Sequence, residues 1–140
     1  MMIVLIHWRI KPDKVDDFLH FWKAVAKVGD RKGLITEMLS EVRTPKDFWY
    51  ATWSLDPESL GDFKSYVNVG FWNDDDEFQK QIADKFNDDS PLKDFEMYRR
   101  RRAILTPATW RRGLAEFPKL DPAGVRPFVS RYWAKLSLGV

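Results

Sequence analysis

The stretch at residues 66–72 reads YVNVGFW, and it runs directly into NDDDEFQ at residues 73–79. Side chains of two kinds alternate along 66–72, which is the period of a strand whose two faces differ. The acidic residues that follow suit the positive end of a helix, which Asn73 or Asp74 can cap. We expect one face of the strand to meet the core (Val67, Val69 and Phe71) and the other to line a small-molecule cavity (Tyr66, Asn68, Gly70 and Trp72).

The rest of the chain adds strands and helices in alternating order. Residues 3–10 have the apolar and aromatic density of a strand, and Asp13 can cap the amphipathic helix that ends near Gly29. A second strand is expected at 33–42, although its mixed polarity leaves its inner face unassigned. An insertion at 43–65 holds an aromatic cluster and a helix start at 56–58. With the helix after 73 and a last strand at 95–105, this order predicts an α+β, ferredoxin-like split β-α-β fold.

Composition sets the outer limits. The 140 residues are 44% hydrophobic and 15% aromatic, which suits one sizeable core. The absence of cysteine rules out disulfides, a thiolate nucleophile and cysteine-bound metals. The apolar run at the start is too short for a signal peptide or a membrane span, so we expect a cytoplasmic protein that is not bound to a membrane.

The charge is unevenly distributed. Residues 99–140 carry ten Lys or Arg against two Asp or Glu, a formal charge of +8, so residues 1–98 carry −6 within the total of +2. We therefore expect a domain at 1–105 and a basic, aromatic extension at 106–140, with Thr106-Pro107 starting a short helix. The extension can pack on the domain or on a dimer partner, or it can bind an anionic ligand. Nucleic-acid binding has no recognised motif to support it.

The alternation of side chains along a strand assigns two groups of basic residues to faces of the predicted sheet. On the 3–10 strand His7 and Arg9 share a face, where a neutral imidazole could act as a base. On the last strand, alternation pairs Arg99 with Arg101 and Arg100 with Arg102, and either pair can face inward. A histidine on a strand is more often structural than catalytic, and an arginine run is more often an ion-pair strip.

Two segments resemble the antibiotic biosynthesis monooxygenase-like family, whose members are dimeric α/β barrels. One is IHWRIKPDK at 6–14 with the helix residues 18–22, and the other is VGFWNDDDEF at 69–78. The resemblance covers about residues 2–105. It implies a homodimer in which two four-stranded sheets pack face to face, with a cavity between each sheet and its helices.

The resemblance also implies an activity, namely oxidation of a small phenolic or quinol-like substrate by O2 without flavin, haem or metal. Asn68 and Trp72 match the family's asparagine and tryptophan, and an arginine of the last strand would complete the set. An amide and a guanidinium can stabilise a developing oxyanion in a dry pocket. Haem-degrading members of the family bind iron through a histidine near the end of the second helix, whereas residues 83–87 here contain none.

The resulting site hypothesis has two parts. The catalytic candidates are Asn68, Trp72 and His7, and the substrate-binding candidates are Tyr66, Arg9, Arg99 and Arg101, with no metal and no cofactor. The alternative is a non-catalytic dimeric protein of the same fold, which binds a small molecule or fills the cavity with its own aromatic side chains.

Overall fold

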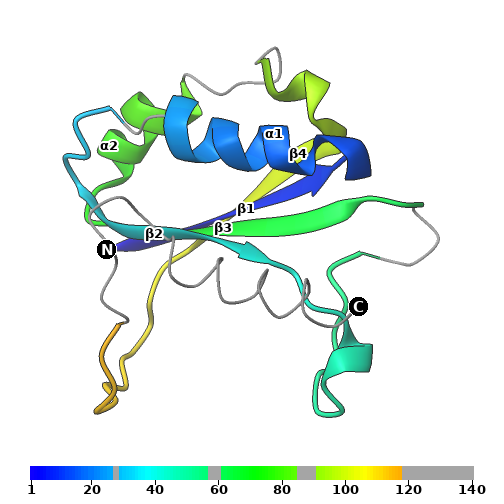
Figure 1. Cartoon of the computed structure of the whole chain (residues 1–140). Coiled ribbons are helices and arrows are strands. Elements are labelled where there is room, and N and C mark those ends of the chain that lie inside the picture. Colours follow the sequence, from blue (N-terminus) through cyan, green and yellow to red (C-terminus); the bar gives the residue numbers. More distant parts are fainter. Residues whose placement is uncertain (27–28, 57–60, 85–90, 118–140) are drawn as a thin grey trace. The chain divides into compact units, whose positions relative to one another are not determined.

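The structure is a computed structural model that describes residues 1–26, 29–56, 61–84 and 91–117. The chain divides into two compact units, Met1–Ala108 and Thr109–Val140. The first unit contains a four-stranded antiparallel sheet (Figure 1) made of β1 (Met2–Ile10), β2 (Leu34–Glu41), β3 (Lys64–Trp72) and β4 (Glu96–Leu105). The strand order is β2-β3-β1-β4. This order confirms the ferredoxin-like α+β fold expected from the sequence.

Two helical segments cover one face of this sheet (Figure 1). The first comprises η1 (Pro12–Lys14), α1 (Val15–His20) and a π-helical turn, η2 (Phe21–Val25). The second comprises α2 (Asp75–Phe78) and a π-helical turn, η5 (Gln79–Ala83), and η6 (Pro91–Asp94) precedes β4.

The helix starts differ in how they are capped. Asp74 caps α2, since its Oδ1 accepts a hydrogen bond of 2.7 Å from the backbone N–H of Asp76. The expected cap at Asp13 is wrong. The helical segment begins at Pro12 and lacks a side-chain cap, and Asp13 lies inside the first turn, where its charge matches the positive end of the helix.

The faces of β3 are opposite to expectation. Tyr66, Asn68, Gly70 and Trp72 are buried under the helices, whereas Val67, Val69 and Phe71 are only half-buried on the other face. The alternation was therefore correct, but the core lies on the Asn68 face. The reason is that the largest apolar surface of the strand, Trp72 with 1% exposure, packs edge-on against Phe78 of α2.

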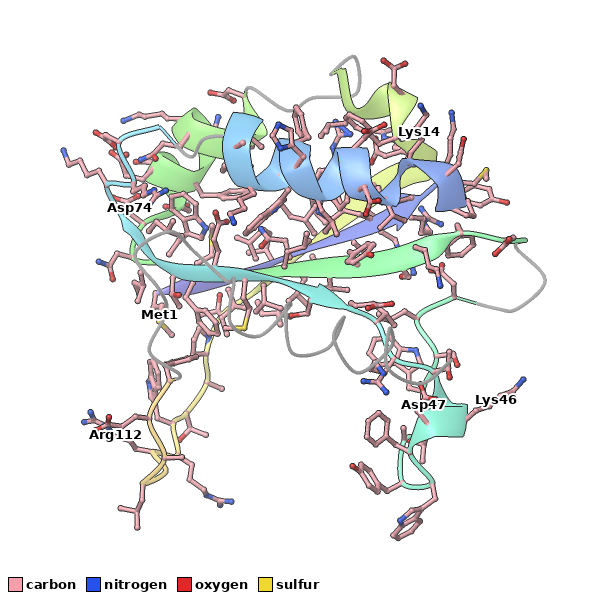
Figure 2. All side chains as sticks on the ribbon, viewed as in Figure 1. Met1, Lys14, Lys46, Asp47, Asp74 and Arg112 are labelled. Atoms are coloured by element: carbon pink, nitrogen blue, oxygen red, sulfur yellow. The ribbon has the colours of Figure 1, made fainter. Side chains whose placement is uncertain are left out.

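Aromatic rings fill the space between the sheet and the helices, where the sticks of both layers meet (Figure 2). Phe18 of α1 is 1% exposed and lies 5.6 Å from the ring of Trp8 and 5.7 Å from that of Tyr66. Because β1 lies between β3 and β4, its helix-facing residues form the centre of the core, namely Val4, Ile6, Trp8 and Ile10.

The insertion contains a short helix, and the described part of the extension differs from expectation. Within the insertion the structure has a short 3-10 helix, η3 (Pro45–Asp47), and the helix start expected at 56–58 lies mostly outside the described residues. The short helix expected after Thr106 is wrong. Residues 106–117 contain no helix, and Trp110 and Leu114, which would have formed its apolar side, are exposed. The expected packing of the extension concerns mainly 118–140, outside the described residues. Among the described helices, none is long and apolar enough to cross a membrane.

Candidate functional site

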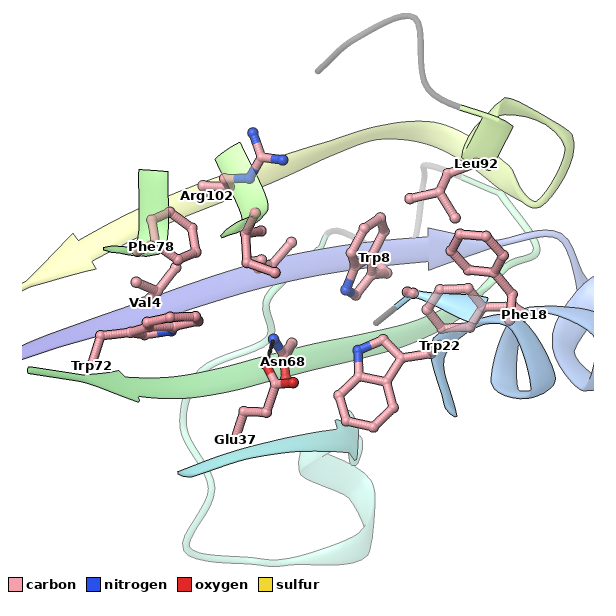
Figure 3. A pocket seen from close by; sticks show the side chains of 14 residues that line it. Val4, Trp8, Phe18, Trp22, Glu37, Asn68, Trp72, Phe78, Leu92 and Arg102 are labelled. Atoms are coloured by element: carbon pink, nitrogen blue, oxygen red, sulfur yellow. Dashed lines mark hydrogen bonds between the residues drawn. The ribbon is translucent and has the colours of Figure 1, made fainter. Parts of the chain in front are cut away.

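A cavity lies between the sheet and the helical layer (Figure 3). Its walls are mostly apolar and aromatic, and they come from all four strands and both helical segments. The volume is about 40 Å³, enough for a few water molecules and less than the roughly 150 Å³ that holds a benzene ring in an engineered protein core. The polar side chains in the lining are few, namely Glu37, Asn68 and Arg102. The lining also contains three indole rings, those of Trp8, Trp22 and Trp72.

Asn68 and Glu37 form the polar end of this cavity (Figure 3). In the register, Asn68 is directly opposite Leu39, and Glu37 is opposite Gly70. The side chains of Glu37 and Asn68 therefore both lie on the face of the sheet that the helices cover. The amide Nδ2 of Asn68 donates a hydrogen bond of 3.2 Å to Oε2 of Glu37. Asn68 is 6% exposed, and its Oδ1 is buried without a hydrogen-bond partner. The site therefore holds an acceptor atom that a ligand could satisfy.

Burial raises the pKa of the Glu37 carboxyl above its ordinary value, while the hydrogen bond from Asn68 and the charge of Arg31 oppose the shift. A carboxyl group with a raised pKa is a stronger base than a solvated one. Sequence reasoning missed Glu37 because the mixed polarity of residues 33–42 left the inner face of that strand unassigned.

Trp72 and Tyr66 lie on the same face as Asn68, as their spacing required. A Cβ atom at Gly70 would lie 3.0 Å from Nε1 of Trp72, so the missing side chain at this position lets the indole lie along the sheet. Tyr66 packs against Phe18 and does not line the cavity. Burial, with help from Glu41 and Asp16, raises the pKa of Tyr66 to about 12, so this phenol stays protonated at neutral pH.

The arginine that reaches the cavity is Arg102. Arg100 lies on the same face, where its guanidinium stacks 5.2 Å from the centre of the Trp8 ring and pairs with Glu96. The structure does not bring Arg99 or Arg101, the two arginines predicted to bind substrate, into the cavity lining. Arg101 is opposite His7 in the register and joins it on the other face of the sheet.

His7 and Arg9 are separated from Asn68 by the thickness of the sheet, because His7 is paired with Val67 and the adjacent Ile6 is paired with Asn68. Both side chains contact a residue of the insertion, Asp56. His7 Nε2 lies 3.2 Å from Oδ2 of Asp56, and Arg9 Nη1 lies 3.7 Å from Oδ1. Arg101 Nη2 donates to Oδ1 of Asp56 at 3.2 Å and to the carbonyl of Leu55 at 2.7 Å. These contacts anchor the insertion to the sheet.

The hydrogen bonds of His7 determine which ring nitrogen carries the proton. Nδ1 accepts a bond of 3.0 Å from Nε of Arg101, so the proton of the neutral ring is on Nε2, which lies 2.5 Å from Oγ of Ser65. A Ser-His-Asp triad needs the serine and the carboxylate on opposite nitrogens, whereas here both are at Nε2. Burial lowers the pKa of His7; Asp56 opposes this shift, while Arg101 and Arg9 add to it. The cluster therefore lacks the geometry of a nucleophilic triad.

One group of carboxylates could hold a metal ion by distance alone. Oxygen atoms of Asp74, Asp75 and Asp76 lie within 4.8 Å of one another, and all three side chains are exposed. Asp74 and Asp75 both accept from the backbone N–H of Asp76, which is the capping geometry of α2. Capping accounts for this arrangement without an ion.

The fold and the cavity define an α+β, ferredoxin-like protein with a small internal cavity of aromatic character. No protein-family model matches the chain, and no curated protein matches it. Among solved structures, the chain is similar to an uncharacterized NIPSNAP domain protein from Burkholderia xenovorans, with 15% sequence identity. The match covers 81% of this chain and 100% of that chain, with a TM-score of 0.44. A likeness of this size carries no argument about activity, and the fold assignment rests on the strand order itself.

Proposed function

We propose that this chain is a monooxygenase of the antibiotic biosynthesis monooxygenase-like type, which oxidises a small phenolic or quinol-like substrate with O2 and needs no cofactor. The observation that carries the proposal is Asn68, a buried amide whose Oδ1 has no partner in an aromatic-lined cavity. A phenol hydroxyl can donate to this oxygen while its ring packs against the indole of Trp72.

The lining residues supply what this chemistry needs. Loss of the hydroxyl proton makes the ring electron-rich, and the positive charge of Arg102 on the cavity wall favours the anion. The anion reduces O2, one oxygen atom enters the ring as a carbonyl, and the other leaves as water. The ring is oxidised to a quinone, so atoms and electrons balance with O2 as the oxidant.

The second candidate function is non-catalytic, and the cavity volume favours it. A cavity of about 40 Å³ does not hold a phenol unless lining side chains move. Trp22 is half-buried and lines the cavity from η2, so its movement would enlarge the space with the least disturbance of the core. If no movement occurs, the chain is a structural protein of this fold whose cavity is filled by its own aromatic rings.

The experiment that separates the two functions is O2 uptake with a panel of phenols and quinols. We expect the wild-type chain to consume O2 with at least one of them. Asn68→Ala is expected to lower kcat/KM about 100-fold, because it removes a polar partner of the reacting oxygen and releases Glu37. The control is Asn73→Ala, an exposed asparagine beside Trp72 that should leave the rate unchanged.

No uptake with any phenol, together with no binding of the same phenols, would reject both the oxygenase and the binding function. Uptake that is equal in Asn68→Ala and wild type would place the reaction elsewhere.

We also propose that the chain forms a homodimer through the sheet face that α1 and α2 leave uncovered. The half-buried side chains on this face come from three neighbouring strands and are mostly apolar, namely Ile3, Leu5, Met38, Val67, Val69 and Phe71. A second copy of the same face would cover them and supply the roughly 800 Å² per partner of a stable interface.

Sedimentation tests this assembly. Wild type should sediment as a dimer at micromolar concentration, and Val69→Lys should be monomeric, because a lysine in the middle of the face would bury its charge. Ala24→Lys places the same lysine on an exposed position of η2 and should stay dimeric. A wild-type monomer, or a dimer that survives Val69→Lys, would contradict the proposal.

A further inference from the structure

Glu37 is the one acidic side chain in the cavity lining described above, and its geometry suggests more than a structural role. It lies on β2, and Oε2 accepts from the Asn68 amide at 3.2 Å. Since the amide nitrogen of Asn68 points to Glu37, the amide oxygen points away from it, and this oxygen is the buried atom without a partner. Carboxylate and amide oxygen therefore present two acceptors at one end of the cavity.

Two neighbouring acceptors select the ligand by its chemistry. A ligand carboxylate or phosphate would add a negative charge beside Glu37 and would leave Asn68 Oδ1 without a donor. A neutral hydroxyl has one proton, which it can donate to either of these acceptors, and its oxygen can in turn accept from a donor such as the buried Nε1–H of Trp8, which also has no partner. The lining thus favours a ligand that enters as a neutral, ring-bearing alcohol or phenol over one that enters as an anion.

We propose that Glu37 accepts the hydroxyl proton of the ligand and that Asn68 is the positioning residue that holds the carboxylate for this transfer. The inference rests on the phenolic substrate proposed above. In the step, the O–H bond of the ligand breaks, an O–H bond forms on Glu37, and the negative charge moves from Glu37 to the ligand oxygen. The charged group that acts on Glu37 is Arg31, before β2, and Arg102 of β4 contributes to the lining of the same cavity.

The surroundings of Glu37 match this role. Burial raises the pKa of its carboxyl, which narrows the difference from a phenol pKa of about 10 and makes proton transfer less unfavourable. His7, the base expected from the sequence, lies on the opposite face of the sheet and uses Nδ1 to accept from Arg101. Glu37 therefore lies in the cavity, where a base is needed, whereas His7 does not reach it.

The probe that tests the transfer is para-nitrophenol, because its phenolate absorbs visible light and its neutral form does not. We expect binding to the wild-type protein to raise the phenolate fraction once the pH exceeds the pKa of Glu37. Glu37→Gln should bind the probe within about threefold of wild type but lose at least about tenfold of the bound phenolate signal. The matched control is Glu41→Gln, an exposed carboxylate on the same strand that should behave as wild type.

A second measurement checks the ionisation of Glu37 without any ligand. A raised pKa means that the folded state binds the proton more tightly, so this contribution to stability is present below the ordinary value of 4.5 and is lost as the pH rises through the folded pKa. Replacing the carboxyl of Glu37 by an amide removes this loss of stability at high pH. We expect Glu37→Gln to melt at a higher temperature than wild type above the folded pKa of Glu37 and to match wild type below pH 4.5.

The outcomes separate this inference from the proposed function. A Glu37-dependent phenolate signal without O2 uptake supports Glu37 as proton acceptor and rejects the oxygenase. O2 uptake that survives in Glu37→Gln at every pH supports the oxygenase activity and rejects Glu37 as the proton acceptor. A phenolate signal that is equal in wild type and Glu37→Gln, or no binding of the probe to wild type, also overturns it.

Discussion

Arg100→Met is expected to lower the free energy of unfolding by about 3–5 kcal/mol. Arg100 Nη1 lies 2.7 Å from Oε2 of Glu96, and the side chains are only 6% and 7% exposed. The backbone N–H of Arg100 also donates to Oε1 of Glu96 at 3.1 Å. Methionine keeps an unbranched apolar chain but removes the guanidinium that stacks on Trp8, and it leaves the Glu96 carboxylate buried without its cation. Breaking one side of a buried pair costs more than the pair itself contributes.

Denaturant unfolding of wild type and three variants measures this effect. Arg99→Met is the control, since it removes an exposed arginine next in sequence, and it should change the free energy of unfolding by less than about 0.5 kcal/mol. The double variant Glu96→Gln with Arg100→Met should recover part of the loss, because no charge then remains unpaired at this place. A single Arg100→Met variant as stable as wild type would show that the carboxylate is compensated in another way.

Phe18→Ala is the second large effect, and we expect it to lower the free energy of unfolding by about 3–5 kcal/mol. Phe18 is 1% exposed, and its ring contacts Trp8 of β1, Tyr66 of β3 and, at 6.5 Å, Phe95 before β4. It therefore connects α1 to two strands of the sheet and to the residue before β4. Its removal enlarges a cavity that the ring already borders, so the surrounding side chains gain little by collapsing.

Thermal and denaturant unfolding measure this loss. Phe18→Leu should cost less than Phe18→Ala, since it retains most of the volume, and Asp17→Ala, the exposed neighbour in α1, should be close to neutral. A loss below about 1 kcal/mol for Phe18→Ala would mean that α1 does not hold the core together.

The sequence predicts the fold well because its signals are local. Alternation along 66–72 and the acidic start that follows define β3 and α2, and the order of elements then leaves few topologies. Alternation also places Asn68 and Trp72 on one face, which the structure confirms. It does not say which face the helices cover. The valines suggested the wrong one because β-branched residues suit a half-buried face as well as a core.

The parts of the site that the sequence does not predict depend on contacts between distant segments. Glu37 lies on a strand without a clear apolar face, and its bond to Asn68 joins residues 31 positions apart. Among the arginines, alternation leaves open whether Arg99 and Arg101 or Arg100 and Arg102 face inward, and the place of Arg102 follows from its pairing with Ile6. The contact of Asp56 with His7 comes from the insertion, where no periodic pattern positions a side chain.

The alternation of side chains along β1 limits how this protein can change in evolution. Ile6 and His7 are neighbours in the chain, yet one faces the Asn68 cavity and the other the Asp56 anchor. Since side chains alternate along a strand, deleting one residue near the start of β1 would not shorten the site but exchange its two sides. The imidazole of His7 would then enter the cavity, and the indole of Trp8 would meet the Asp56 carboxylate. Length changes in this strand should therefore be far rarer among descendants of this gene than substitutions, whereas the insertion can vary in length as long as Asp56 still reaches the sheet.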